Sequence, residues 1–96
     1  MKLSSIQHKG LRRFVMHNDP AGLNPQCVNK LRNMLNFMME MDDVQELRGI
    51  PGWRFHALTG DQKGRYILTV NRNWRLTFGF NVKTREIIDL DFEDYH

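Results

Sequence analysis

The chain has a single cysteine, Cys27, among its 96 residues, and this scarcity excludes several kinds of site. One cysteine cannot form an internal disulfide or a thiolate metal cluster, which is typical of a protein from a reducing compartment. Serine is almost as rare: only Ser4 and Ser5 are present, so we do not expect a serine-based hydrolytic triad. Cys27 lies among apolar residues at helical spacing, and we expect it to be a small buried side chain.

Long apolar runs are also missing, and the opening residues 1–5 show no signal-peptide or membrane-spanning pattern. We therefore expect a cytoplasmic protein without membrane contact. The four histidines have no paired spacing that suits a metal, and the glycines form no phosphate-binding loop. No metal or cofactor is expected. A chain of this length has room for one hydrophobic core, so residues 1–96 are predicted to form a single domain.

Acidic residues are scarce in most of the chain and concentrated at its end. Residues 86–96 hold five of the 11 acidic residues and no Lys or Arg, so the first 85 residues carry a net charge of +8. A basic body attracts polyanions such as nucleic acid, although many soluble domains carry similar charge without binding any.

Two helices are predicted in the first half of the chain. Apolar residues recur at helical spacing from His8 to about His17, and the opposite side of that segment carries Lys9, Arg12 and Arg13. The second helix is predicted to begin with Asn24 as its cap and Pro25 in its first turn, and to run to about Met41. Residues 42–47 are expected to add one more turn, and residues 3–7 a short edge strand.

The second half reads as strands and turns. Alternating apolar and polar residues predict strands over 53–58, 65–70, 74–80 and 85–92. In the last of these we expect Ile88, Leu90 and Phe92 to share one face. The short connections predict antiparallel pairing. The result is an α+β fold with two N-terminal helices packed on one face of a small antiparallel sheet, and a polar opposite face that carries His56, Arg75 and Arg65.

These polar residues suit metal-free cleavage of RNA. That reaction needs a base, an acid and positive charge at the phosphate. Histidine is the side-chain type whose unperturbed pKa lies nearest neutrality, which makes His56 and His96 the candidates for acid and base. The charge is expected from Arg65, Arg75 and either Lys63 or Arg54, and Tyr95 can stack on a base or donate its hydroxyl. A lone strand histidine also fits a structural role and a terminal tripeptide often frays, so the residue types alone leave both interpretations open.

Three strings, taken in order, resemble a known family: H-x-L-x-G-D at 56–61, N-W-R-L-T-F at 73–78 and E-D-Y-H at 93–96. They are similar to the HigB group of bacterial toxins in the RelE superfamily of ribosome-dependent mRNA endonucleases, and residues 7–11 also resemble the start of that group. The resemblance implies a RelE-like fold and metal-free cleavage of mRNA on the ribosome. It also implies a partner, a HigA-type antitoxin with a helix-turn-helix. The toxin would contact operator DNA only indirectly, through this antitoxin.

The resemblance also assigns roles to residues. His56, Asp94, Tyr95 and His96 match the catalytic set of the family, with His56 and His96 sharing proton transfer and Asp94 orienting one of them. Arg75 matches the arginine of the N-W-R string, where it either holds phosphate or braces the site. We expect the last strand to hold the terminal residues beside His56. The basic helical residues Lys9, Arg12 and Arg13 are expected to contact ribosomal RNA.

One position departs from the family pattern. Many relatives read H-P-L-K-G-D where this chain reads His56-Ala57-Leu58-Thr59-Gly60-Asp61, so the lysine position is Thr59. Lys63 or Arg65 are candidates to replace that cation. The departure also favours an alternative function, a catalytically weak or inactive module that acts mainly as a co-repressor with its antitoxin. A stand-alone RNA- or DNA-binding protein is a further alternative.

Overall fold

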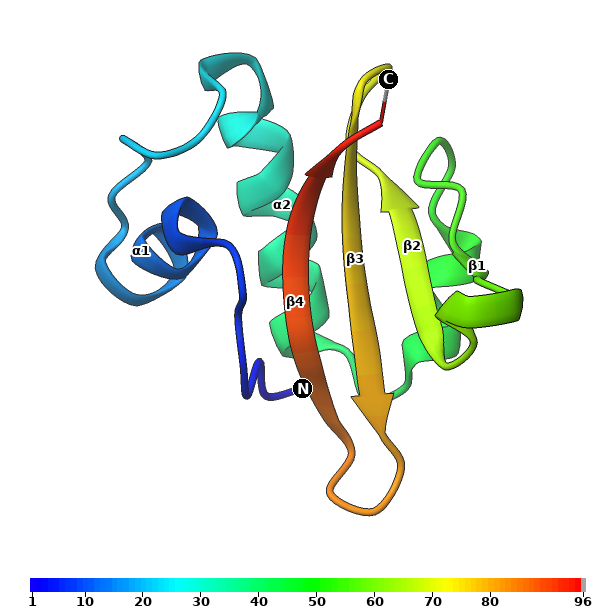
Figure 1. Ribbon diagram of the computed structural model, residues 1–96. Helices are drawn as coiled ribbons and strands as arrows, with labels where there is room; N and C mark the ends of the chain where they lie inside the picture. The colour runs from blue at the N-terminus through cyan, green and yellow to red at the C-terminus, as the bar shows by residue number, and fades with distance from the viewer. Residues whose placement is uncertain (96) are drawn as a thin grey trace.

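The fold is an α+β arrangement of helices on a four-stranded sheet, as predicted (Figure 1). The computed structural model describes residues 1–95. The elements in chain order are α1 (Lys9–His17), η1 (Pro25–Cys27), α2 (Val28–Glu40), η2 (Val44–Gly49), β1 (His56–Ala57), η3 (Gly60–Gln62), β2 (Arg65–Thr69), β3 (Trp74–Asn81) and β4 (Glu86–Asp94). The strands lie in the order β1-β2-β3-β4, and each neighbouring pair is antiparallel.

Side-chain caps fix where the helical segments begin. The Nδ1 atom of His8 accepts a hydrogen bond from the backbone N–H of Leu11 at 3.0 Å. Asn24 accepts from the N–H of Gln26 at 3.0 Å, and Pro25 follows in the first turn, where its missing N–H costs nothing. The second helix thus starts where the sequence predicted, although its first turn is the 3-10 helix η1.

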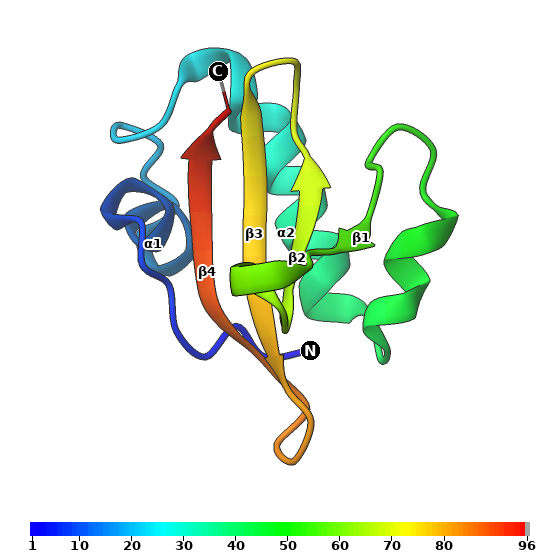
Figure 2. The same ribbon diagram turned by 45° about the vertical axis from the view of Figure 1, so that its right-hand side comes forward.

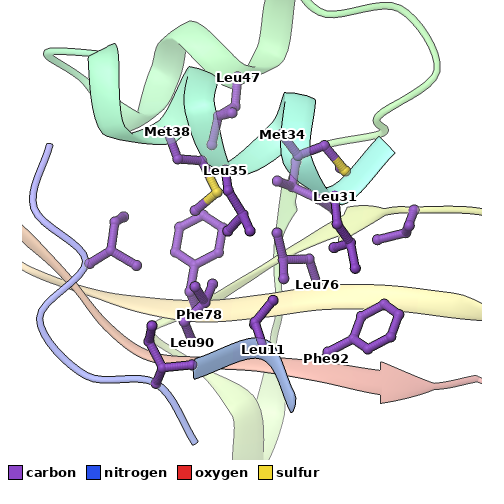
Figure 3. Packing of buried hydrophobic residues seen from close by; sticks show 14 of the residues in the cluster. Leu11, Leu31, Met34, Leu35, Met38, Leu47, Leu76, Phe78, Leu90 and Phe92 are labelled. Carbon is purple, nitrogen blue, oxygen red and sulfur yellow. The ribbon is translucent and has the colours of Figure 1, made fainter. Parts of the chain in front are cut away.

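One hydrophobic core joins both helices to the sheet. In Figure 3 the side chains of α2 point toward Leu76 and Phe78 of β3, and Leu11 of α1 lies near Leu90 and Phe92 of β4. Leu76 and Phe78 are fully buried. Figure 1 shows α2 along one face of the sheet and α1 beside β4. No helix in residues 1–95 is both long and apolar enough to cross a membrane.

The prediction that Ile88 shares a face with Leu90 and Phe92 is wrong, because β4 contains a bulge. Thr77 of β3 pairs with Asp91, but Gly79 pairs with Ile88, so β4 has one extra residue in this stretch. An extra residue reverses the alternation of faces. Ile87 is therefore the buried residue, and Ile88 lies over Gly79, where an added Cβ would be 3.1 Å from its Cγ1.

The strand predicted over 53–58 is also shorter than expected. The regular strand covers only His56 and Ala57, although Trp53 and Leu58 also form backbone hydrogen bonds with β2. Arg54 has a φ of 51°, which is incompatible with extended β geometry and breaks the strand two residues before His56. The alternation at 53–58 therefore reflects an irregular segment, in which Phe55 reaches the core and His56 remains exposed.

The N-terminal residues lie along the outer edge of β4, as expected for an edge segment. Leu3 and Ile6 form isolated parallel bridges with Ile87 and Leu90. The bulge in β4 lies between these two bridges, and this interrupts the ladder that a continuous strand would need. Residues 3–7 are thus hydrogen-bonded to the sheet without forming a regular strand.

Cys27 is buried, as predicted, and it should react slowly in the folded protein. Its side chain is almost fully buried, its Sγ accepts a hydrogen bond from Asn71 Nδ2 at 3.3 Å, and burial raises the pKa of the thiol. The thiolate is the reactive form, so alkylation by iodoacetamide should follow unfolding. We expect mass spectrometry to show little labelling in native buffer and complete labelling in concentrated urea. Equal rates in the two conditions would contradict this burial.

Candidate functional site

The candidate site is the sheet face opposite α2, which we call the site face. Its members follow from the strand register, because residues directly opposite one another share a face. One row joins His56, Ile67, Thr77 and Asp91 across all four strands. The neighbouring rows add further polar residues, namely Thr69, Arg75, Glu93 and Arg65. Figure 2 shows η3 lying across this face on the side away from α2.

His56 is exposed at the β1 edge of the site face and is oriented by the backbone. Its Nδ1 atom lies 2.8 Å from the carbonyl oxygen of Arg54. A carbonyl only accepts hydrogen bonds, so this contact favours the tautomer with the proton on Nδ1. The neutral ring then presents the lone pair of Nε2 outward. His56 can therefore accept a proton from a substrate hydroxyl.

The C-terminal segment is attached to β3 as far as Tyr95. Asp94 is exposed and pairs with Trp74, and the N–H of Tyr95 donates to the carbonyl of Asn73 at 2.5 Å. The Tyr95 ring lies 5.5 Å from the guanidinium carbon of Arg75 and is 46% exposed. The backbone is therefore hydrogen-bonded to β3 as far as Tyr95, and the Tyr95 ring lies partly exposed beside Arg75. His96 lies outside the described residues.

Arg75 is braced by backbone carbonyls. Its Nη1 donates to Asn71 O at 2.7 Å and to Trp74 O at 3.1 Å. Both oxygens flank the turn before β3, so the guanidinium fixes that turn against the start of the strand. These hydrogen bonds use only the Nη1 nitrogen of the guanidinium. The same guanidinium also lies against the Tyr95 ring. The bracing role considered from the sequence is therefore present in the structure.

Arg65 belongs to a polar chain that the sequence did not reveal. Its Nη2 donates to Thr77 Oγ1 at 3.0 Å and to Asp89 O at 3.0 Å. Thr77 in turn donates to Glu93 Oε2 at 2.5 Å. Thr77 and Glu93 were part of the strings that carry the family resemblance, but nothing in their spacing indicates that they meet Arg65. Lys63 is exposed at the end of η3.

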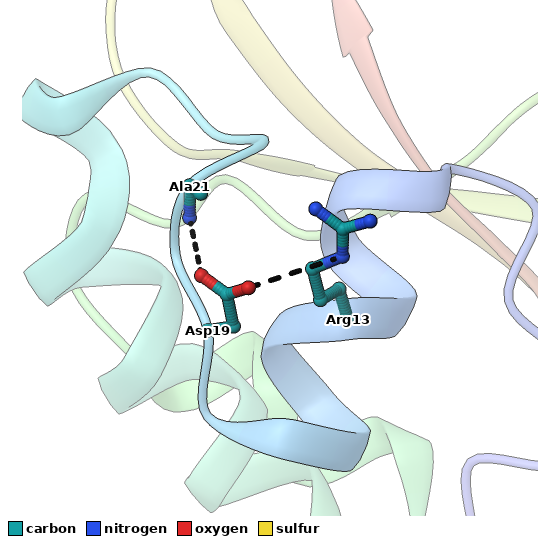
Figure 4. Close-up of polar contacts among 3 residues, drawn as sticks. All are labelled: Arg13, Asp19 and Ala21. Atoms are coloured by element: carbon teal, nitrogen blue, oxygen red, sulfur yellow. Dashed lines mark hydrogen bonds and ion pairs between the residues drawn. The ribbon is translucent and has the colours of Figure 1, made fainter.

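The basic residues of α1 are partly engaged within the protein. Arg12 donates through Nε and Nη2 to the carbonyl of Ile6, at 3.1 and 2.7 Å. Arg13 lies 3.9 Å from Asp19, whose other oxygen accepts from the N–H of Ala21, as Figure 4 shows. Lys9 is exposed. The three cations remain at the surface of α1 but on a different element from the site face.

The structure does not place Asp94 beside His56, contrary to the expectation for the last strand. These residues lie on β1 and β4, the two outer strands of the sheet order. Three strand spacings of about 4.8 Å separate their backbones by roughly 14 Å across the sheet. Asp94 also pairs with Trp74, one position beyond the pair of Arg75 and Glu93, so the register assigns it to the opposite face of the sheet. Within residues 1–95, no cluster of His, Cys, Asp or Glu has a metal-binding arrangement.

Comparison with known sequences assigns the chain to a protein family. Residues 4–96 match the family described as RelE-like toxin of type II toxin-antitoxin system HigB. The chain is 34% identical over 95 residues to Endoribonuclease HigB from Proteus vulgaris, and the match covers 98% of this chain and 99% of that protein. These matches confirm the resemblance seen in the three sequence strings.

Solved structures share the fold. YafQ from E. coli strain BL21(DE3) superposes with a TM-score of 0.62 at 11% identity, covering 98% of this chain and 93% of that one. The YoeB-YefM complex from Staphylococcus aureus contains a chain that superposes with a TM-score of 0.57 at 18% identity, covering 100% and 99%. At these identities the likeness concerns the fold alone, and it confirms the predicted RelE-like architecture.

Proposed function

Because the chain belongs to the HigB family of RelE-like toxins of type II toxin–antitoxin systems, we propose that it is an endoribonuclease that cleaves mRNA on translating ribosomes and so inhibits translation. The observation that carries this proposal is the exposed His56, whose Nδ1 is bound by Arg54 O so that Nε2 faces solvent. The curated relative from Proteus vulgaris is itself named an endoribonuclease. Two arginines on the same sheet face supply positive charge for a phosphate.

The proposed reaction uses no metal. A base takes the proton of a ribose 2′-hydroxyl, the 2′-oxygen forms a bond to phosphorus, and the bond to the 5′-oxygen breaks as an acid protonates that oxygen. His56 and His96 share the two proton transfers, and Asp94 orients one of them. Tyr95 contacts the substrate, and Arg75, Arg65 and Lys63 stabilise negative charge on the phosphate. The products are a 2′,3′-cyclic phosphate and a 5′-hydroxyl.

The proposed partners follow from the family. A HigA-type antitoxin with a helix-turn-helix binds the toxin, and operator DNA is contacted only through that antitoxin. The exposed cations of α1 (Lys9, Arg12 and Arg13) contact ribosomal RNA, and this contact should weaken as salt concentration rises. The chain acts in the cytoplasm, where ribosomes and mRNA are found.

A test is to express the wild-type chain and the His96→Ala variant and to map mRNA 5′ ends. We expect new 5′-hydroxyl ends with the wild type only. A second test uses purified ribosomes loaded with mRNA and a chelator that does not remove ribosomal magnesium. EDTA with Mg²⁺ added in excess meets this condition. Either treatment should leave the cleavage rate unchanged. Activity that vanished on chelation and returned with a transition-metal ion would contradict the metal-free mechanism.

The alternative function is a non-cleaving co-repressor, and Thr59 is the feature that favours it. Thr59 is exposed at the start of η3 and brings no positive charge to the site face. If the wild-type chain left growth and transcripts intact while it still strengthened operator binding by its antitoxin, the co-repressor function would replace the enzyme. Tight sequence-specific binding of nucleic acid by the toxin alone would instead support a stand-alone binding protein.

A further inference from the structure

The side chain of Arg65 crosses the site face from β2 to β4. Gly79 of β3 is its cross-strand partner, and the side chain of Ile88 from β4 lies over that glycine. The guanidinium ends at the carbonyl oxygen of Asp89 and the hydroxyl of Thr77, each 3.0 Å from Nη2. The two bonds come from different strands, so Nη2 is fixed in position between β3 and β4.

The bulge in β4 makes one of these acceptors available. Asp89 has a φ of 51°, and its N–H donates to Ser5 Oγ at 2.8 Å instead of joining the ladder with β3. The altered backbone turns the Asp89 carbonyl toward Arg65. A regular strand would use that carbonyl for pairing, so the bulge and the arginine position depend on one another.

Thr77 connects Arg65 to a carboxylate without an ion pair. Thr77 is buried, and its hydroxyl has one proton, which it donates to Glu93 Oε2 while it accepts from Arg65. Among residues 1–95, no carboxylate lies within ion-pair distance of the Arg65 guanidinium. The hydroxyl therefore orients the guanidinium while leaving its charge available.

We propose that Arg65 binds a phosphate of the RNA substrate through a remaining N–H group, on Nε or Nη1, and that Thr77 and Glu93 are the residues that position it. Both hydrogen bonds that the structure shows for Arg65 use Nη2, which leaves the N–H groups of Nε and Nη1 to donate singly to phosphate oxygens. This inference rests on the proposed function, since it names a substrate contact of the same site face.

Arg65 also lies where it can replace a cation at position 59. The N–H of Leu58 donates to the carbonyl of Arg65 at 2.9 Å, so Thr59 is one residue beyond the point where the two segments pair. A lysine at position 59 would start from a backbone next to that of Arg65. The proposal therefore predicts that Thr59→Lys compensates for loss of the Arg65 charge.

The experiment measures cleavage of mRNA on programmed ribosomes by the purified chain. Arg65→Gln should lower kcat/KM by roughly 10- to 100-fold, the range expected for loss of a charge-assisted hydrogen bond. Thr77→Val should also lower kcat/KM. Thr77→Ser keeps the hydroxyl and should retain most of the wild-type kcat/KM. Adding Thr59→Lys to Arg65→Gln should recover activity. Lys83→Gln is the control, because it removes one exposed charge from the β3–β4 turn.

A second measurement uses ribosomes that carry mRNA with 2′-O-methyl riboses, which cannot be cleaved. Arg65→Gln should weaken binding to this probe more than Lys83→Gln does. For Arg65→Gln, the slope of log binding constant against log salt concentration should also become less steep by about 0.7. Equal effects of the two variants in both assays would overturn the inference, as would full activity of Thr77→Val. A wild-type chain that binds the probe but never cleaves normal mRNA would contradict the proposed function, while the binding comparison would still decide the role of Arg65.

Discussion

Replacing His56 by alanine is expected to lower the rate of mRNA cleavage by about 100- to 10,000-fold, the usual contribution of a general acid or base. The side chain is exposed, and its recorded contact is the hydrogen bond to Arg54 O. The variant should therefore fold normally and lose only proton transfer. The rate is best measured under single-turnover conditions on programmed ribosomes, so that product release does not mask the chemical step.

The matched control for this prediction is His17→Ala. His17 is also an exposed histidine, but it lies in the last turn of α1, away from the site face. Its replacement should change the cleavage rate by less than about twofold if histidine chemistry is confined to the site. A His56→Ala variant that cleaved as fast as His17→Ala would remove His56 from the mechanism. A His56→Gln variant helps to separate loss of proton transfer from loss of side-chain volume.

Replacing Gly10 by alanine is expected to destabilise the fold by about 3 kcal/mol, the upper part of the range for overpacking. A Cβ at Gly10 would lie 2.3 Å from the carbonyl oxygen of Gly22 and 2.7 Å from its carbonyl carbon. Both are backbone atoms, so no side chain can move aside. Helix α1 must shift away from the loop before η1, and the packing of Leu11 and Phe14 in the core is disturbed with it.

The control for this prediction is Gly49→Ala at the end of η2. Nothing lies within 4 Å of a Cβ at that position. Its free energy of unfolding should change by less than about 1 kcal/mol, since only chain entropy and local propensity differ. Urea denaturation of both variants provides the comparison, with the slope of free energy against urea unchanged. Equal stability of the two variants would show that α1 and the Gly22 loop are not in close contact.

Local features of the sequence were sufficient to predict the helices and most of the strand pattern. Asn24 indicates the start of the second helix, and apolar spacing marks the buried faces of α1 and α2. Such signals act over a few residues, so they can be recognised in the sequence without knowledge of the tertiary structure. The alternation in β3 likewise placed Leu76 and Phe78 in the core.

The features that the sequence did not predict depend on contacts between distant segments. The bulge in β4 places Asp89 at positive φ, and Ser5, 84 residues away, binds its N–H. One extra residue then moved Ile88 to the site face and Ile87 to the core. Periodicity cannot detect an insertion that tertiary contacts stabilise.

The candidate site shows the same division. The types and approximate placement of His56, Arg65 and Arg75 on one face follow from strand alternation. Their partners do not, because hydrogen bonds of the Arg65–Thr77–Glu93 kind join three different strands. The separation of His56 from Asp94 follows from the strand order, in which consecutive hairpins place the first and last strands at opposite edges of the sheet.

The N-terminal segment along β4 has a consequence for solubility. Exposed sheet edges offer unpaired N–H and C=O groups on which another chain can add a strand and begin to aggregate. In this protein residues 3–7 cover part of one edge beside a bulge, and the strand at the other edge, β1, has only two residues. Neither edge is a long, regular template. This arrangement therefore disfavours aggregation by the addition of strands at the sheet edges.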